Sequence, residues 1–345
     1  QLQCTDCHYA LNNPAHAFEA QGDNPDHLVY DPRTLEIGEY LERPDHNFAR
    51  GQSAQFNVAP ELKGTMRRCD SCHDSSKGHE SWLPYVDTHM AVIACETCHI
   101  PQMYAPAIQS YDWTVLTTGN QPVKTCRGVE GEPNQVTSLV TGYKPVLLNR
   151  RNIDGDLLLT PYNLITTYYW VYDDANGNQR PVRLLDLESA FLENGSYAAD
   201  IVSAFDANSD GSLSSNELVI NSSAKEEIVK SKLAALGLGN PRIEGLVQPY
   251  SINHNVARGA DARNDCKTCH NEESRVSQPI LLANYAPNGT LPVFDANNNI
   301  NASGEIVTGE DGAVYYNPVP ANDKMYVFGS SRVNWIDWFG AAAFA

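Results

Sequence analysis

Eight of the nine cysteines in this 345-residue chain fall into four copies of one pattern, Cys-x-x-Cys-His. The copies are Cys4-Thr-Asp-Cys7-His8, Cys69-Asp-Ser-Cys72-His73, Cys95-Glu-Thr-Cys98-His99 and Cys266-Lys-Thr-Cys269-His270. Zinc ribbons and redox dithiols also use Cys-x-x-Cys, but neither requires a histidine directly after the second cysteine. Four repeats of the full pattern therefore constrain the chain more than any other feature.

This spacing is the one used for covalent attachment of haem c. The two thiols of each motif reach the two vinyl groups of one porphyrin, and the next residue lies under the iron as its proximal ligand. The sequence predicts four haem c groups, with His8, His73, His99 and His270 as proximal ligands. Because haem is attached on the far side of the cytoplasmic membrane, we expect an exported protein that is extracellular or on the cell surface, or alternatively periplasmic. A leader directly before Gln1 would have been removed on export.

Six further histidines are candidates for the distal iron ligands: His16, His27, His46, His79, His89 and His254. Four six-coordinate irons need four distal ligands, so the chain holds enough histidine for bis-His ligation at every haem. No histidine occurs between His99 and His254. The fourth haem is therefore expected to use His254, to dock against the N-terminal region, or to take a ligand from a neighbouring subunit.

A twelve-residue segment that ends at Glu217 matches the EF-hand calcium loop at each ligand position. The matching side chains, in the order of loop positions 1, 3, 5, 7, 9 and 12, are Asp206, Asn208, Asp210, Ser212, Ser214 and Glu217. Gly211 permits the sharp turn at position 6. Helical periodicity over 197–205 and 224–236 predicts a helix on each side of the loop. The loop and its two helices together predict one bound calcium ion. A surface turn rich in Asp and Asn is the alternative.

The motifs divide the chain into five segments. These are a tri-haem segment at 1–105, a haem-free β-rich region at 106–190, an EF-hand-like calcium region at 191–245, a fourth-haem segment at 246–285, and C-terminal strands and turns at 286–345. Because haems replace much of a side-chain core, we expect a mostly irregular multihaem cytochrome fold. It would contain short helices, a small β-rich middle region and one EF-hand-like helix-loop-helix.

Three strand signals support the β-rich parts. The β-branched and aromatic run at 162–172, the turn residues at 173–178 and the segment 181–184 predict a hairpin. Residues 313–316 and 325–328 are further strand candidates. No apolar run has the length of a transmembrane helix.

Acidic residues outnumber basic ones by 42 to 24, which gives a formal net charge of −18. Such a surface repels nucleic acid and anionic lipid. Calcium ions or basic partner proteins suit such a surface better, and the alternative is that the charge only confers solubility. We expect redox partner proteins or extracellular electron acceptors as partners.

One segment, from Tyr85 through His89 to Cys95-Glu-Thr-Cys98-His99-Ile-Pro101, resembles a segment of octahaem tetrathionate-reductase-like cytochromes. In that family the upstream histidine ligates a different haem, which implies that His89 is distal to a neighbouring haem. This chain has four motifs and not eight, so the resemblance does not imply the reductase activity. Four haems on an Asn-rich exported chain also resemble the subunits of extracellular cytochrome filaments.

Electron transfer through four bis-His haems is the function that these features predict, with the chain as a subunit of a homopolymeric filament joined through its haem-bearing ends. A diffusible electron carrier is the first alternative. A multihaem reductase with one catalytic haem is the second, and it needs an iron with an open axial position. A calcium-stabilised structural protein is a third possibility, but four covalent redox centres argue against it. We expect no enzymatic activity, because no convincing acid-base cluster accompanies the motifs.

Overall fold

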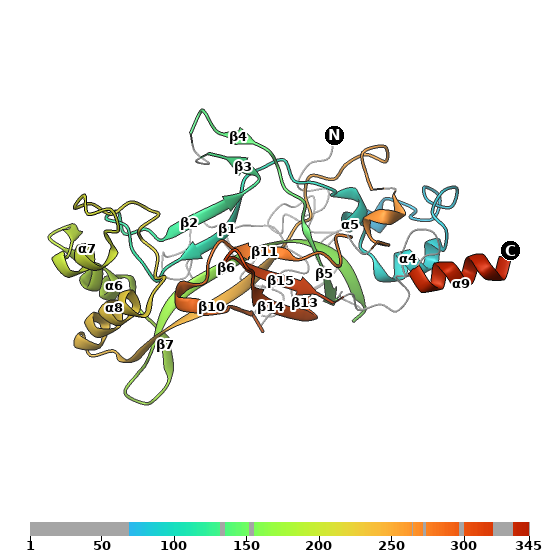
Figure 1. The fold of residues 1–345 in the computed structure, drawn as a ribbon. Coiled ribbons are helices and arrows are strands. Elements are labelled where there is room, and N and C mark those ends of the chain that lie inside the picture. Colours follow the sequence, from blue (N-terminus) through green and yellow to red (C-terminus); the bar gives the residue numbers. More distant parts are fainter. Residues whose placement is uncertain are drawn as a thin grey trace, which may run out of the picture. The chain divides into compact units, whose positions relative to one another are not determined.

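The computed structural model describes residues 69–131, 135–151, 155–263, 265–271, 274–296, 300–319 and 334–344 (Figure 1). The first motif, Cys4–His8, lies outside the described residues. The same holds for His16, His27 and His46, and for the strand candidate at 325–328.

The chain forms two compact units, and each combines segments that are distant in sequence. The first unit contains the described residues up to 98 together with 149–151, 155–160 and 300–301. The second contains 99–131, 135–148, 161–263, 265–271, 274–296, 302–319 and 334–344.

The helices are short. They are η4 (Cys69–Ser71), α4 (Val86–Val92), α5 (Cys95–His99), α6 (Leu184–Phe191), α7 (Ala199–Phe205), α8 (Ser223–Ala235), η5 (Cys266–Thr268), η6 (Pro287–Gly289) and α9 (Asn334–Phe344). None of these described helices is long and apolar enough to cross a membrane.

The strands differ widely in length. They are β1 (Ala107–Asp112), β2 (Val123–Arg127), β3 (Val129–Glu130), β4 (Leu139–Val140), β5 (Val146–Arg151), β6 (Leu157–Asp173), β7 (Gln179–Pro181), β8 (Leu192–Glu193), β9 (Ser196–Tyr197), β10 (Gly239–Ser251), β11 (Ile280–Ala283), β12 (Val293–Phe294), β13 (Ile300–Asn301), β14 (Gly304–Thr308) and β15 (Val314–Pro318).

The second unit is organised around the long strand β6. In order across the sheet, β12, β10, β6, β1 and β2 lie side by side. Figure 1 labels β10, β6, β1 and β2 among the central ribbons. β10 and β2 are antiparallel to their neighbours β6 and β1, whereas β1 is parallel to β6 and β12 to β10. The aromatic run predicted as a strand therefore has strands on both sides, and Tyr162, Tyr168 and Trp170 are buried.

The predicted hairpin is confirmed. β6 and β7 are antiparallel, with Val171 opposite Pro181 and Asp173 opposite Gln179. The Asp174 carboxylate accepts the backbone N–H groups of Asn176 and Asn178, both at 2.9 Å. An aspartate that binds N–H groups two and four residues ahead fixes this turn by local chemistry.

The helices α6, α7 and α8 gather at one end of the sheet in the second unit (Figure 1). The predicted flanking helices of the calcium loop are confirmed as α7 and α8, and Ile201 and Phe205 lie on the buried face of α7. The Phe205 ring meets that of Phe191 edge-on at 6.1 Å between centroids. Val229 and Leu233 of α8 complete the core, so apolar packing holds the two ends of the loop.

A smaller antiparallel sheet, β11-β15-β14, contains the confirmed strand at 314–316. The side chain of Arg127 on β2 donates to the carbonyls of Leu164 and Leu281, both at 3.3 Å, and so connects this sheet to the larger one. In the first unit, β13 pairs with the end of β5.

Candidate haem sites

The three described Cys-x-x-Cys-His motifs all fold as a single helical turn. The second is η4 and the fourth is η5, and in both the histidine N–H donates to the carbonyl of the first cysteine, at 2.9 Å and 2.8 Å. The third motif is α5 in its entirety. One turn brings both sulfurs to the same side of the chain and places the histidine one turn later, which is the arrangement that a covalently attached haem requires.

The third motif is anchored by Thr97, which lies between its two cysteines and is buried. The hydroxyl of Thr97 donates to the Leu159 carbonyl at 2.7 Å, and the Ala94 N–H donates to the same carbonyl at 2.9 Å. Two donors on one carbonyl fix the position of Cys95 and Cys98 on the first unit.

The second and third motifs touch through their first cysteines. The thiols of Cys69 and Cys95 hydrogen-bond to each other, which lowers the pKa of Cys95 to about 7 and raises that of Cys69. In a protein with haem attached, both sulfurs would be thioethers. Neither sulfur could then donate a hydrogen bond to the other.

The ring nitrogen Nδ1 of three histidines is engaged with a backbone carbonyl. His79 Nδ1 lies 2.6 Å from the Ser75 oxygen, and His89 Nδ1 lies 3.1 Å from the Tyr85 oxygen. A histidine that donates from Nδ1 carries its lone pair on Nε2, the nitrogen that then ligates a metal. His79 and His89 are therefore held as the tautomer expected of distal iron ligands.

The proximal histidine of the third motif has the same arrangement, but with a distant partner. His99 Nδ1 lies 3.2 Å from the Ala257 oxygen, and the Ala257 N–H donates to the His99 carbonyl at 2.7 Å. The Asn255 side chain also donates to the Gln102 carbonyl at 3.2 Å. These contacts bring the segment that follows His99 against the segment that carries His254.

His254 itself is exposed and follows the end of β10. His270, the proximal histidine of the fourth motif, is half-buried. The distal role of His254 stays a prediction.

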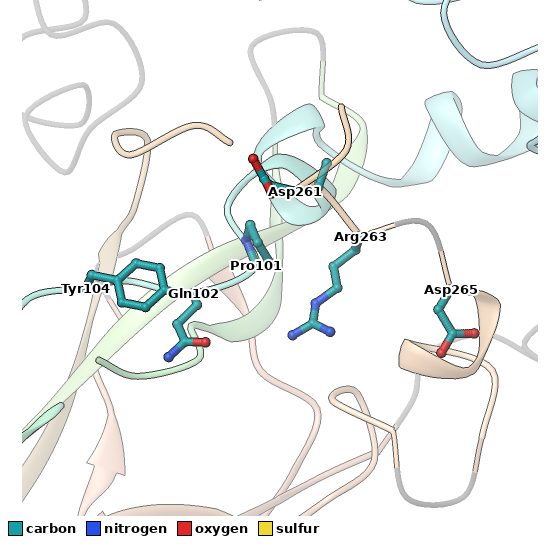
Figure 2. A pocket seen from close by; sticks show the side chains of 7 residues that line it. Pro101, Gln102, Tyr104, Asp261, Arg263 and Asp265 are labelled. Atoms are coloured by element: carbon teal, nitrogen blue, oxygen red, sulfur yellow. The ribbon is translucent and has the colours of Figure 1, made fainter. Parts of the chain in front are cut away.

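A polar hollow of about 240 Å³ lies between the chain that follows the third motif and the chain that enters the fourth (Figure 2). Its lining residues are Pro101, Gln102, Tyr104, Asp261, Ala262, Arg263 and Asp265. Figure 2 shows the side chains of Arg263 and Asp265 on the segment that leads into Cys266. Asp265 also caps η5, because its carboxylate accepts the Lys267 N–H at 3.0 Å.

The predicted calcium loop has a positive φ at the glycine of its sequence pattern. Gly211 adopts a φ of 81°, and its N–H donates to the Asp206 carboxylate at 2.8 Å. The Glu217 carboxylate accepts the N–H of Ala207 at 3.0 Å and the N–H of Ser214 at 2.9 Å. The first and last loop positions therefore close the loop through hydrogen bonds.

The loop carboxylates bind N–H and O–H groups of the loop, and these bonds lower their pKa. Hydrogen bonds from Ser214 lower the pKa of Glu217, and those from Ser212 lower that of Asp210. Across the described ranges, no three His, Cys, Asp or Glu side chains gather as a metal-binding cluster. The oxygen donors of the loop suit calcium chemically, and the calcium site stays a prediction.

Sequence reasoning missed the groups that support the motifs: Thr97 and the carbonyls of Ser75, Tyr85 and Ala257. The spacing of four residues between Ser75 and His79, and between Tyr85 and His89, is a helical signal that could have suggested two of them. Nothing local in the sequence points to the pairing of His99 with Ala257.

No protein-family model matches this chain, and no curated protein resembles it in sequence. Among solved structures, an octaheme cytochrome c from Shewanella oneidensis matches at 15% sequence identity, with a TM-score of 0.35. The match covers 72% of this chain and 57% of that one.

Proposed function

We propose that this protein transfers electrons through four covalently attached haem c groups, each with two histidine ligands. The four Cys-x-x-Cys-His motifs carry this proposal. The helical turns of the three described motifs, and the Nδ1 contacts of His79, His89 and His99, support it. When bound, the haem supplies the redox chemistry, and the protein sets ligation, burial and charge around it.

The haem count is tested by pyridine haemochrome analysis together with the mass of the intact chain. Four haems per chain are expected. Replacing both cysteines of one motif by alanine, as in Cys266→Ala with Cys269→Ala, should remove one haem and leave three. A chain without covalent haem would overturn the proposal.

Ligation is tested by optical and paramagnetic-resonance spectra of the oxidised protein. All four irons should be low-spin, because six histidines outside the motifs are available for four distal positions. A high-spin signal equal to one haem would point to an open axial position. That result would favour a multihaem reductase over an electron carrier.

We further propose that the chain assembles end to end into an extracellular filament. A heterologous contact that repeats without closing produces such a polymer. The surplus of histidines permits one distal ligand to come from a neighbouring subunit, with His16, His27 and His46 as the candidates. Electron microscopy of the protein and of the variants His16→Ala, His27→Ala and His46→Ala tests this. If the unmodified protein stays monomeric at high concentration, a diffusible carrier remains.

The calcium loop is proposed as a structural clip within the same protein. The match to the loop pattern supports this, as do the positive φ of Gly211 and the packing of α7 against α8. Exported modules of this kind bind calcium with dissociation constants of roughly 0.1–1 mM.

A further inference from the structure

The ammonium group of Lys225 contacts the chain at both ends of the predicted calcium loop. At the entry, its Nζ lies 4.8 Å from the ring centroid of Phe205, the residue before the first loop position. At the exit, Nζ donates to the carbonyl of Glu217, the last loop position, at 3.3 Å and to the carbonyl of Val219 at 3.2 Å. One side chain of α8 therefore connects the two chain segments that the loop separates.

The groups on both sides of these contacts are fixed by the fold. Phe205 is fully buried in the core, and so are Leu218 and Ile220, which follow the loop. Lys225 lies in the first turn of α8, where its N–H donates to the capping hydroxyl of Ser222 at 3.4 Å. The ammonium therefore joins two anchored segments from an anchored helix start.

Both contacts depend on the positive charge of Lys225. A hydrogen bond from a charged donor is roughly twice as strong as one from a neutral donor. An ammonium over the face of an aromatic ring is attracted to the negative face of the ring, and this attraction is larger where water is partly excluded. Lys225 is half-buried, so its charge opposes separation of the two ends of the loop.

The same charge also repels a calcium ion, so Lys225 has two opposing effects on calcium binding. Binding needs Asp206 and Glu217, the first and last loop positions, to be held close together. A loop that is closed beforehand loses less conformational entropy on binding. The repulsion, in contrast, is reduced by water and salt.

We propose that closure is the larger effect and that Lys225 is a positioning residue of the calcium site, which holds the two ends of the loop together before calcium binds. The contacts of Lys225 with Phe205 and with the Glu217 carbonyl carry this inference. It rests on the proposed calcium loop, and it assigns to that loop a residue outside the twelve-residue pattern.

Calcium titration of the full-length haem protein by isothermal calorimetry tests the inference with Lys225→Met. Methionine retains an unbranched apolar side chain and removes the charge and the N–H donors. The variant should bind calcium about fivefold more weakly than the wild type, which corresponds to the loss of one hydrogen bond. Lys225→Arg keeps a charged donor that also binds aromatic faces, so it should recover most of this loss.

Lys232→Met is the matched control. Lys232 is also a half-buried cation of α8, and its Nζ binds the Asp200 carboxylate, in the first turn of α7, at 2.7 Å. This change removes the same charge from the same helix and leaves the contacts of Lys225 in place. Its calcium affinity should therefore stay within about twofold of the wild type, as expected for a change of under 0.5 kcal/mol.

Hydrogen exchange in the presence of a chelator tests closure without the ion. The N–H groups of Ala207, Gly211 and Ser214 donate to loop carboxylates, so their exchange reports how often the loop opens. Exchange at these amides should be about fivefold faster in Lys225→Met than in the wild type, and unchanged in Lys232→Met.

Equal or tighter calcium binding by Lys225→Met would overturn the inference, because repulsion would then match or exceed the effect of closure. An equal loss of affinity in Lys232→Met would overturn it too, and so would unchanged exchange of the loop amides in Lys225→Met. Each of these results leaves the calcium loop itself intact. A wild type that binds no calcium removes the proposed calcium loop and this inference together, and does not affect the electron-transfer proposal.

Discussion

Thr97 offers a quantitative test of how the fold holds a haem motif. The change Thr97→Val replaces the hydroxyl, which donates to the Leu159 carbonyl at 2.7 Å, by a methyl group of similar shape. Both side chains are β-branched, so their rotamer entropy in a helix is similar. The Leu159 carbonyl keeps the Ala94 N–H at 2.9 Å, so no buried group is left without a partner.

Thr97→Val should therefore lose the stabilisation of one neutral hydrogen bond, about 1 kcal/mol. Because this bond is local, its loss should lower the free energy of local opening of α5 more than the free energy of global unfolding. A loss of about 1 kcal/mol corresponds to roughly fivefold faster exchange of the protected amides of residues 93–99. The measurement is native-state hydrogen exchange by mass spectrometry, with four haems per chain verified in each variant.

Thr268→Val is the matched control, because Thr268 holds the same place in the fourth motif and is half-exposed. Within the described ranges its hydroxyl makes no hydrogen bond. Exchange around residues 266–270 should therefore stay within about twofold of the wild type, as expected for a change of under 0.5 kcal/mol. If Thr97→Val leaves exchange unchanged, or if Thr268→Val accelerates it equally, the Leu159 contact does not anchor the motif.

Three further predictions concern carboxylates. Calcium should raise the melting temperature of the wild type but not of Glu217→Gln, because the amide replaces a bidentate ligand; equal responses would mean that the loop is only a turn. The pKa values of Asp210 and Glu217 are lowered in the fold, so their stabilisation is present above the unfolded pKa values and is lost as pH falls. Thermal melts between pH 7 and pH 3 should therefore show a smaller acid loss for Glu217→Gln than for the wild type. Burial raises the pKa of Asp112, whose carboxylate accepts the Tyr285 hydroxyl at 2.7 Å. Its contribution is present below the unfolded pKa and is lost as pH rises, so Asp112→Asn should gain stability relative to the wild type as the pH rises above about 4. A difference that stays constant with pH would show that Asp112 does not titrate in this range.

The features that were predicted correctly depend on residues that lie within about a dozen positions of one another in the sequence. The hairpin of β6 and β7 follows from an aromatic run and the hydrogen bonds of Asp174. Helices α7 and α8 follow from apolar periodicity, and Ser222 caps α8 by accepting the Lys225 N–H. Because both signals are local, they do not depend on the rest of the fold.

The extent of the larger sheet was not predictable in this way. Its strand β10 pairs with β6 over the register from Ser251–Tyr162 to Gly239–Asp173, and it lies in a region that the sequence indicated only through the calcium loop and the fourth haem. Alternation of apolar and polar residues marks a strand but does not say which strand it will pair with.

The sequence alone determined where haem can be attached and which histidines are available, because Cys-x-x-Cys-His acts within one helical turn. Only the tertiary structure decided what surrounds each motif. It placed the thiol of Cys69 against that of Cys95, the carbonyl of Ala257 against the ring of His99, and the N–H of Arg275 against the carbonyl of Thr268. His99 and Ala257 are 158 positions apart, and contacts over such distances arise from how the strands and loops pack. Charge and ligand orientation at a haem depend on those contacts, so they follow from the fold and not from the motif.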